Sequence, residues 1–215
     1  VFSTDSAFAA LRADGSVVTW GELSSSGDSG AVATQLDGTI DVKEVFSTDS
    51  AFAALRADGS VVTWGSVGGD SSSVATKLDG SIDVTQVFST SGAFAALRAD
   101  GSVVTWGGQY VHGAPGSLAF ISYGGDSSAV ATELDGTIDV KQVFSTLGAF
   151  AALRADGSVV TWGESSSGGD SSAVANQLTN VVSMANPLTD DDYTDTDTLP
   201  SVSDLLQSGN TLVTA

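Results

Sequence analysis

The sequence AFAALRADGSVVTWG occupies residues 7–21, and the same fifteen residues return without a change at 51–65, 93–107 and 149–163. The tetrapeptide VFST precedes every copy. Recurrence of this kind indicates a repeat architecture, in which each copy is one supersecondary unit that packs against its neighbours. We therefore predict four structural repeats, which lie at about residues 1–44, 45–86, 87–142 and 143–186.

The repeated string is predicted to form a β-hairpin. In the first copy, Asp14-Gly15 separates the apolar run AFAALRA from the β-branched run that begins at Val17. Asp-Gly between two such runs is a strong hairpin signal, because a type I′ turn requires a positive φ at both central positions. A helix is disfavoured here, since glycine interrupts it and consecutive β-branched residues oppose it.

A further strand is predicted after a second Asp-Gly pair, as in TIDVKEVF after Asp37-Gly38. The patch AVAT at 31–34 has two interpretations, a fourth strand or a single helical turn capped by the preceding Asp-Ser pair. Three or four antiparallel strands in a repeat of this length are typical of a β-propeller blade. The predicted fold is therefore all-β, a propeller-like array of four blades with three to four antiparallel strands each.

The segment ALRADGSVVTWG resembles the A-L-x-x-D-G-x-V-x-x-W-G core of the regulator of chromosome condensation (RCC1-like) β-propeller repeat. Its sequence is most similar to the divergent form found in large secreted or surface proteins of bacteria, where ADGSVVTWG is followed by GGDSSAVA. The resemblance covers residues 1–185. It implies one propeller blade per repeat and an extracellular or cell-surface location.

This chain departs from that family's pattern in two ways. It lacks the Gly-His-Ser before the apolar strand and the Gly-Gln-Leu-Gly after Trp-Gly, so nucleotide-exchange activity on a small GTPase is not implied. The family's propeller usually has seven blades. Four blades leave three alternatives: a ring that continues in further sequence, a ring closed by association, or a smaller or open assembly. A C-terminal strand at 179–184, added to the incomplete first repeat, would lock the array within one chain.

Two large residue types recur at one position in every copy. The arginines are Arg12, Arg56, Arg98 and Arg154, and the tryptophans are Trp20, Trp64, Trp106 and Trp162. An unpaired arginine inside an apolar strand is strongly destabilising, so each should pair with an aspartate of the same or a neighbouring blade, such as Asp14 or Asp41. The tryptophans are predicted to pack between blades, with stacking on a carbohydrate as the alternative.

The third repeat carries an insertion, GQYVHGAPGSLAFISY, at 108–123. It contains the only histidine and a concentration of aromatic residues, and its candidate binding residues are Tyr110, His112, Phe120 and Tyr123. Loops that break a repeat and gather such residues are frequent recognition sites. The alternative is a tolerated insertion that folds over the edge of the blade.

The charge of the chain excludes two classes of partner. With 26 acidic and 7 basic residues its formal net charge is −19, which repels nucleic acids and anionic lipids. No apolar run is long enough for membrane insertion. The charge has two interpretations, solubility or calcium binding, for which the acidic tail at 187–215 offers weak candidate ligands in Asp190, Asp192, Asp195 and Asp197. No cofactor other than calcium is expected, and a solvated linker is the alternative for the tail.

Catalysis has little support in the sequence. There is no cysteine, a single histidine and no phosphate-binding loop, and the aspartates recur with the repeats as turn residues do. We therefore predict that the protein is not an enzyme. The leading hypothesis is a structural or adhesive module of a secreted bacterial surface protein, whose partners are protein or glycan surfaces. The alternatives are a self-assembling subunit that binds other copies of itself, and a carbohydrate-binding or carbohydrate-active protein.

Overall fold

The computed structural model describes residues 1–23, 26–112 and 119–182, and for 109–112 and 119–122 it describes the backbone alone. The chain divides into two compact units, Val1–Val181 and Val182–Ala215. The fold described below is that of the first unit. No helix within the described ranges is long and apolar enough to cross a membrane.

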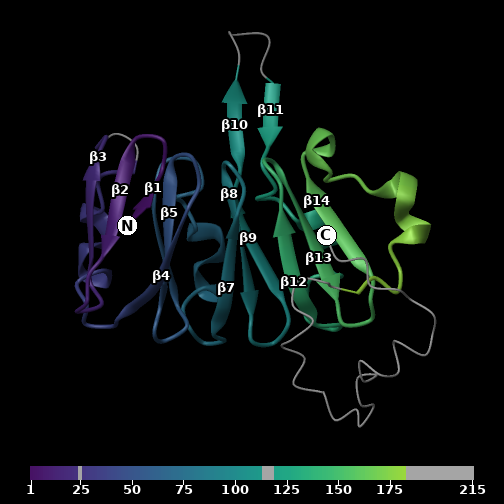
Figure 1. The fold of residues 1–215 in the computed structure, drawn as a ribbon, viewed down its shortest axis with the longest axis horizontal. Coiled ribbons are helices and arrows are strands. Elements are labelled where there is room, and N and C mark those ends of the chain that lie inside the picture. Colours follow the sequence, from purple (N-terminus) through teal and green to yellow (C-terminus); the bar gives the residue numbers. More distant parts are fainter. Residues whose placement is uncertain (24–25, 113–118, 183–215) are drawn as a thin grey trace, which may run out of the picture. The chain divides into compact units, whose positions relative to one another are not determined.

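Four antiparallel sheets of three strands each form the first unit, and we call them blades 1 to 4 in chain order (Figure 1). Blade 1 consists of β1 (Phe2–Ser3), β2 (Ala7–Leu11) and β3 (Val17–Gly21), and blade 2 of β4 (Val42–Ser47), β5 (Ala51–Arg56) and β6 (Val61–Gly65). Blade 3 consists of β7 (Val84–Ser89), β8 (Ala93–Arg98) and β9 (Val103–Gly107), and blade 4 of β12 (Val140–Ser145), β13 (Ala149–Arg154) and β14 (Val159–Gly163). The predicted all-β fold with four propeller-like blades is confirmed.

The hairpin inside each blade forms where the sequence predicted it, but the predicted type I′ turn is wrong. The Gly15 amide donates to the Arg12 carbonyl (3.0 Å), and the Arg12 amide donates to the Ser16 carbonyl (2.9 Å). Gly15 has a φ of +76°, whereas Asn180 is the only non-glycine residue with a positive φ among those described. The connection is thus a three-residue loop with one left-handed glycine. Asp14 stays at negative φ, where its Oδ1 accepts hydrogen bonds from the Ser16 amide and hydroxyl.

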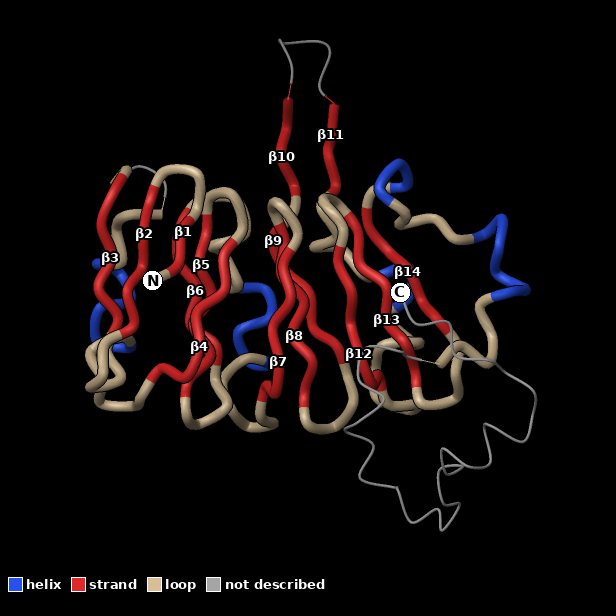
Figure 2. Tube along the Cα trace, viewed as in Figure 1, coloured by secondary structure: helices blue, strands red, loops and turns tan. Residues whose placement is uncertain are grey.

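The apolar patch after each hairpin, which the sequence left open as a fourth strand or a helical turn, is helical. It forms short 3₁₀ helices, which Figure 2 shows in blue: η1 (Gly30–Gln35), η2 (Ser72–Lys77), η3 (Ser128–Val130) and η5 (Ser172–Gln177). Another, η4 (Ser165–Ser167), lies just after β14. An aspartate precedes each repeated helix and accepts a hydrogen bond from a backbone amide two residues later, as Asp70 does from Ser72 (2.9 Å). This local bond competes with the extended backbone that a fourth strand would need.

Successive blades pack through the residues that all repeats share. In blade 2, Phe52 and Trp64 stack on each other with their ring centroids 5.2 Å apart. Together with Val62 they pack against Ala7 and Ala9 of blade 1, in one buried cluster. Small residues on one side thus accommodate large aromatic rings on the other. Because both faces of β5 are buried, AFAALR does not alternate between apolar and polar residues.

Blade 1 differs from the others because its first strand is short. β1 has two residues, which pair with Ala9 and Phe8 of β2. In blade 2 the corresponding strand continues until Val42 pairs with Arg56. No other described strand joins the sheet of blade 1. Of the predicted closing strand at 179–184, the described part does not form a strand, and residues 183–184 lie outside the described ranges.

Candidate functional site

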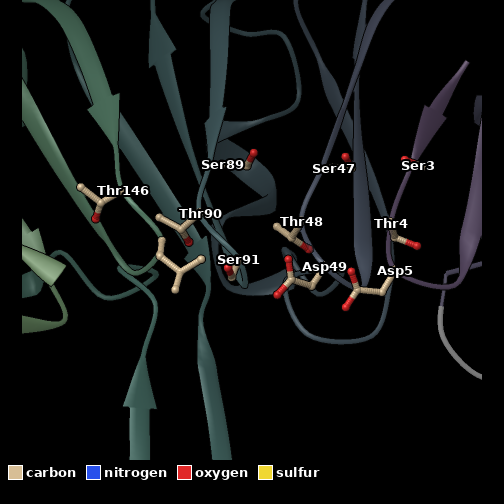
Figure 3. Close-up of a pocket in the computed structure, with 11 residues that line it drawn as sticks. Ser3, Thr4, Asp5, Ser47, Thr48, Asp49, Ser89, Thr90, Ser91 and Thr146 are labelled. Atoms are coloured by element: carbon tan, nitrogen blue, oxygen red, sulfur yellow. The ribbon is translucent and has the colours of Figure 1, made fainter. Parts of the chain in front are cut away.

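The first strands of the four blades end in a segment where the otherwise identical copies differ. Between VFST and AFAALRADGSVVTWG stands a variable dipeptide: Asp-Ser in blades 1 and 2, Ser-Gly in blade 3 and Leu-Gly in blade 4. The strands that carry it lie next to one another, since β1 contacts β4, β4 contacts β7, and β7 contacts β12. The first variable residue of each repeat, Asp5, Asp49, Ser91 or Leu147, thereby lines one cavity, and Figure 3 labels the first three.

These segments line an open basin of about 470 Å³, which we call the hydroxyl basin. Its lining consists of serine, threonine and aspartate side chains together with one leucine: Ser3, Thr4, Asp5, Ser47, Thr48, Asp49, Ser89, Thr90, Ser91, Thr146 and Leu147. Figure 3 draws all of them and labels ten, with Asp5 and Asp49 side by side where their strands end. The threonine hydroxyls bond within the protein, so the groups that the basin offers are its serine hydroxyls and two carboxylates.

Repeated threonines fix the backbone around the hydroxyl basin. The Thr48 hydroxyl accepts a hydrogen bond from the Ala51 amide (3.0 Å), and the Thr48 amide donates to the Ala51 carbonyl (2.9 Å). Thr90 makes the same two bonds to Ala93. Each threonine therefore closes a tight turn, which holds the variable residue that follows it in a set position.

A chain of backbone hydrogen bonds connects the variable residues across the blades. The Asp5 amide donates to the Asp49 carbonyl (2.9 Å), and the Asp49 amide donates to the Ser91 carbonyl (3.0 Å). The Ser91 amide in turn donates to the Leu147 carbonyl (3.0 Å). This chain of backbone bonds fixes the positions of the four variable residues relative to one another.

The carboxyl group of Asp49 has a raised pKa. Partial burial raises the pKa of Asp49, the neighbouring charge of Asp5 raises it further, and a hydrogen bond with Ser91 opposes both effects. Elsewhere the repeat lowers the pKa of its aspartates, as at Asp70, where the side chain and backbone of Ser72 donate hydrogen bonds to the carboxylate. Among the aspartates with a shifted pKa, Asp49 in the hydroxyl basin therefore binds a proton most readily.

We expect Asp49→Asn to raise the free energy of unfolding at pH 7 and Asp70→Asn to lower it. A carboxyl group with a raised pKa stabilises the fold below its ordinary value of 3.8 and loses that contribution as the pH rises through the folded-state value. A lowered pKa has the opposite effect, which is present above 3.8 and lost as the pH falls. Both changes should stay below about 1 kcal/mol, because solvent screens charges as exposed as these.

Urea unfolding of the two variants and the parent at pH 7 and pH 3 tests this expectation. Asp49→Asn should approach the parent at pH 3, where Asp49 is itself neutral, and Asp70→Asn should also move closer to it. A loss of stability at pH 7 in Asp49→Asn would contradict the raised pKa that burial, with the charge of Asp5, gives to Asp49.

The predicted binding residues of the insertion lie in an additional hairpin. β10 (Gln109–His112) pairs with β11 (Ala119–Ser122), so that Tyr110 stands opposite Ile121 and His112 opposite Ala119. Their side chains and that of Phe120 lie outside the described part of the structure. The hairpin extends beyond the ends of the other strands (Figure 1).

Tyr123 is the one predicted binding residue whose side chain is described. Its carbonyl accepts a hydrogen bond from the Thr90 hydroxyl (2.8 Å), so the base of the insertion adjoins the hydroxyl basin. A second cavity of about 390 Å³ is lined by Tyr123 together with Asp5, Asp49 and Ser91. The structure thus places one residue that the sequence predicted beside three that the prediction missed.

The sequence did contain a signal for Asp5, Asp49, Ser91 and Leu147. Within the block that runs from VFST to VVTWG, the dipeptide between the two constant strings is the only part that varies among the four copies. Its significance could not be recognised without the contacts between first strands. The metal candidates Asp190, Asp192, Asp195 and Asp197 lie outside the described residues. Among the residues that are described, no three His, Asp or Glu side chains form a metal-binding group.

The repeated arginines stand where the second strand of each blade meets the hairpin turn, and they do not line the hydroxyl basin. Arg98 forms an ion pair with Asp100 (3.4 Å) and donates a hydrogen bond to the Ser102 hydroxyl (3.1 Å). The other arginines also pair with the aspartate two residues later, at 3.2 Å for Arg12, 3.8 Å for Arg56 and 3.9 Å for Arg154. The sequence left open an aspartate of the same blade or of a neighbouring one. The partner of each arginine is the aspartate of its own hairpin turn.

No family model matches the chain, and no curated protein matches it. The structure is similar to human WBSCR16, with 20% sequence identity and a TM-score of 0.44 over 75% of this chain and 46% of that one. It is also similar to Prp20p from Saccharomyces cerevisiae, with 18% identity and a TM-score of 0.47 over 75% of this chain and 43% of the other.

A third similar structure is the CRINKLY WD40 ectodomain of the Arabidopsis thaliana receptor kinase ACR4, with 18% identity and a TM-score of 0.44. This match covers 76% of this chain and 53% of that one. The chain spans about half or less of the length of these three structures. Its structural matches therefore include RCC1-like β-propellers at low sequence identity.

Proposed function

We propose that this chain is a non-catalytic interaction module of a secreted bacterial surface protein, and that its hydroxyl basin contacts a glycan. One observation carries the proposal. The position that follows the repeated VFST string differs between the copies, and all four of its residues, Asp5, Asp49, Ser91 and Leu147, line the hydroxyl basin beside serines and threonines that every repeat shares. Residues needed for the fold alone would be expected to recur in every copy, so the varied position is where specificity can reside.

The chemistry of the basin supports a polyhydroxylated ligand. The serine hydroxyls of the basin can donate and accept hydrogen bonds, and its carboxylates accept them strongly from sugar hydroxyls. Tyr123, which lines the adjoining cavity, adds an aromatic ring with an apolar face. The net charge of −19 favours neutral or basic partners over anionic ones. A protein partner with basic residues is the other ligand class that this surface would accept.

The proposal is tested by screening the chain on an array of neutral and basic bacterial and host glycans, with the double variant Asp5→Asn and Asp49→Asn beside it. We expect the double variant to bind at least about tenfold more weakly, because a hydrogen bond to a charged group contributes about 1.5–3 kcal/mol. Asp28→Asn with Asp170→Asn removes the same charge outside the basin and serves as the control. Retention of no glycan, or equal binding by both double variants, would contradict the proposal.

A further inference from the structure

The two end faces of the blade array expose residues that are buried everywhere between blades. On blade 1, Phe8, Val18 and Trp20 are 45%, 48% and 46% exposed. We call these three residues the leading face. At the same positions of blade 2, Phe52, Val62 and Trp64 are 0%, 4% and 5% exposed, because blade 1 covers them. Phe8 and Trp20 nevertheless stack at 5.3 Å as the buried pairs do, so the leading face is already formed.

At the opposite end of the array, blade 4 exposes the residues that would pack against such a leading face. Phe144 and Val174 are 47% and 43% exposed, and Leu178 is half-buried. We call these three residues the trailing face. Their counterparts in the preceding repeat, Phe88 and Val130, pack beside the buried aromatic pair of the next blade. Leu134, the counterpart of Leu178, is only 2% exposed.

The backbone at each end has the same complementarity. The Val42 amide donates to the Gly15 carbonyl (2.9 Å), and this bond marks the start of the first strand of the next blade. After blade 4, the Val181 amide makes the equivalent bond to the Gly157 carbonyl (2.9 Å). The chain thus leaves blade 4 at the place where a further first strand would begin.

In blade 1 the first strand pairs with β2 over two residues. Nothing in β1 stands opposite Leu11 and Arg12, whereas the equivalent residues of blade 2 pair with Glu44 and Val42. Accordingly the Arg12 side chain is 58% exposed, against 11% for that of Arg98. No described strand is therefore opposite Leu11 and Arg12 in the sheet of blade 1.

We propose that the leading face of one chain docks on the trailing face of a second copy of this chain, in the geometry that joins consecutive blades within it. The occupant is a second copy because its two faces carry the same residues that already pack against each other at three internal interfaces. This goes beyond the proposed function, since it concerns the ends of the array and not the hydroxyl basin. Contacts of this head-to-tail kind give a closed ring or an open filament.

Sedimentation velocity of the 215-residue chain over a range of concentrations tests the docking. We expect the mean mass to rise with concentration, and to rise more steeply at higher salt, which screens the repulsion between chains of charge −19. A strict monomer at high concentration and high salt would overturn the proposal. So would a monomer in which Trp20 is shielded from a fluorescence quencher, because residues 183–215 or another segment would then cover the leading face.

Single-face variants show whether the contact is head to tail. Trp20→Glu and Phe144→Glu place a charge on half-exposed residues and should each weaken self-association at least about tenfold. Mixed in equal amounts, the two variants should form a heterodimer that grows no further, because each retains one intact face. Thr76→Glu adds the same charge on exposed η2, inside the array, and should associate as the parent does.

Circular dichroism and urea unfolding of the monomers establish that all three variants fold. If Trp20→Glu folds but associates as strongly as the parent, or if the mixture forms no heterodimer, the contact does not join these faces. The glycan assay is independent of this outcome, since neither substituted face includes the two basin carboxylates.

Discussion

Replacing Trp106 by alanine is expected to lower the free energy of unfolding by about 3–5 kcal/mol, the usual range for removing a large aromatic residue from a core. Its indole is only 2% exposed and stacks on Phe94 in the interface between blades 2 and 3. The same substitution at Trp20 should cost less than about 1.5 kcal/mol, because the leading face is open and mainly the stacking on Phe8 is lost.

The two tryptophans are an internally matched pair. They stand in the same fifteen-residue string, so their local propensities and sequence neighbours are identical. Urea unfolding followed by circular dichroism measures both losses, at a concentration where the chain is monomeric so that docking does not protect Trp20. Equal losses at the two positions would show that the blades do not pack on one another through this residue.

Gly101→Ala is expected to lower the free energy of unfolding by about 2–5 kcal/mol. Gly101 has a φ of +75°, which is unfavourable for alanine by about 1–2 kcal/mol. In addition a Cβ atom there would lie 2.7 Å from the Cα of Asp139, and relieving such an overlap costs about 1–3 kcal/mol. Asp139 precedes the first strand of blade 4, so the clash would push consecutive blades apart.

Gly168→Ala separates the two contributions. Gly168 also has a left-handed backbone, with a φ of +99°, but a Cβ atom there would meet nothing within 4 Å. We therefore expect it to lose only the conformational part, about 1–2 kcal/mol. Thermal or urea unfolding of the two variants gives the comparison. A loss at Gly168 as large as that at Gly101 would mean that close approach of the blades contributes nothing.

Much of the fold could be predicted because its determinants are local. The apolar run, the turn residues and the β-branched run of each copy specify a hairpin within fifteen residues, and repetition multiplies it by four. The turn type was predicted wrongly because two geometries use Asp-Gly, and side-chain hydrogen bonds of Asp14 to Ser16 favour the one that keeps Asp14 at negative φ. The segment before Leu36 was left open in the same way, because local hydrogen bonds that favour a helical turn compete there with a fourth strand.

The candidate site was less accessible to sequence reasoning. The insertion was predicted because it breaks the repeat visibly, and Tyr123 does adjoin the hydroxyl basin. Asp5 and Asp49 are 44 residues apart in the chain, and only the contact between their strands makes them neighbours. A single-residue difference within a repeat becomes meaningful when all copies of that position face one basin.

By itself the sequence of this protein determined the hairpins, the number of blades and the positions of arginine and tryptophan, since these depend on short-range backbone preferences that every copy shares. Tertiary structure alone decided what identical residues do in different places. Trp20 and Trp106 have the same neighbours in sequence, yet one is half exposed and the other buried. The physical reason is that burial depends on whether a neighbouring blade covers a face: blade 2 covers Trp106, whereas no described blade covers Trp20.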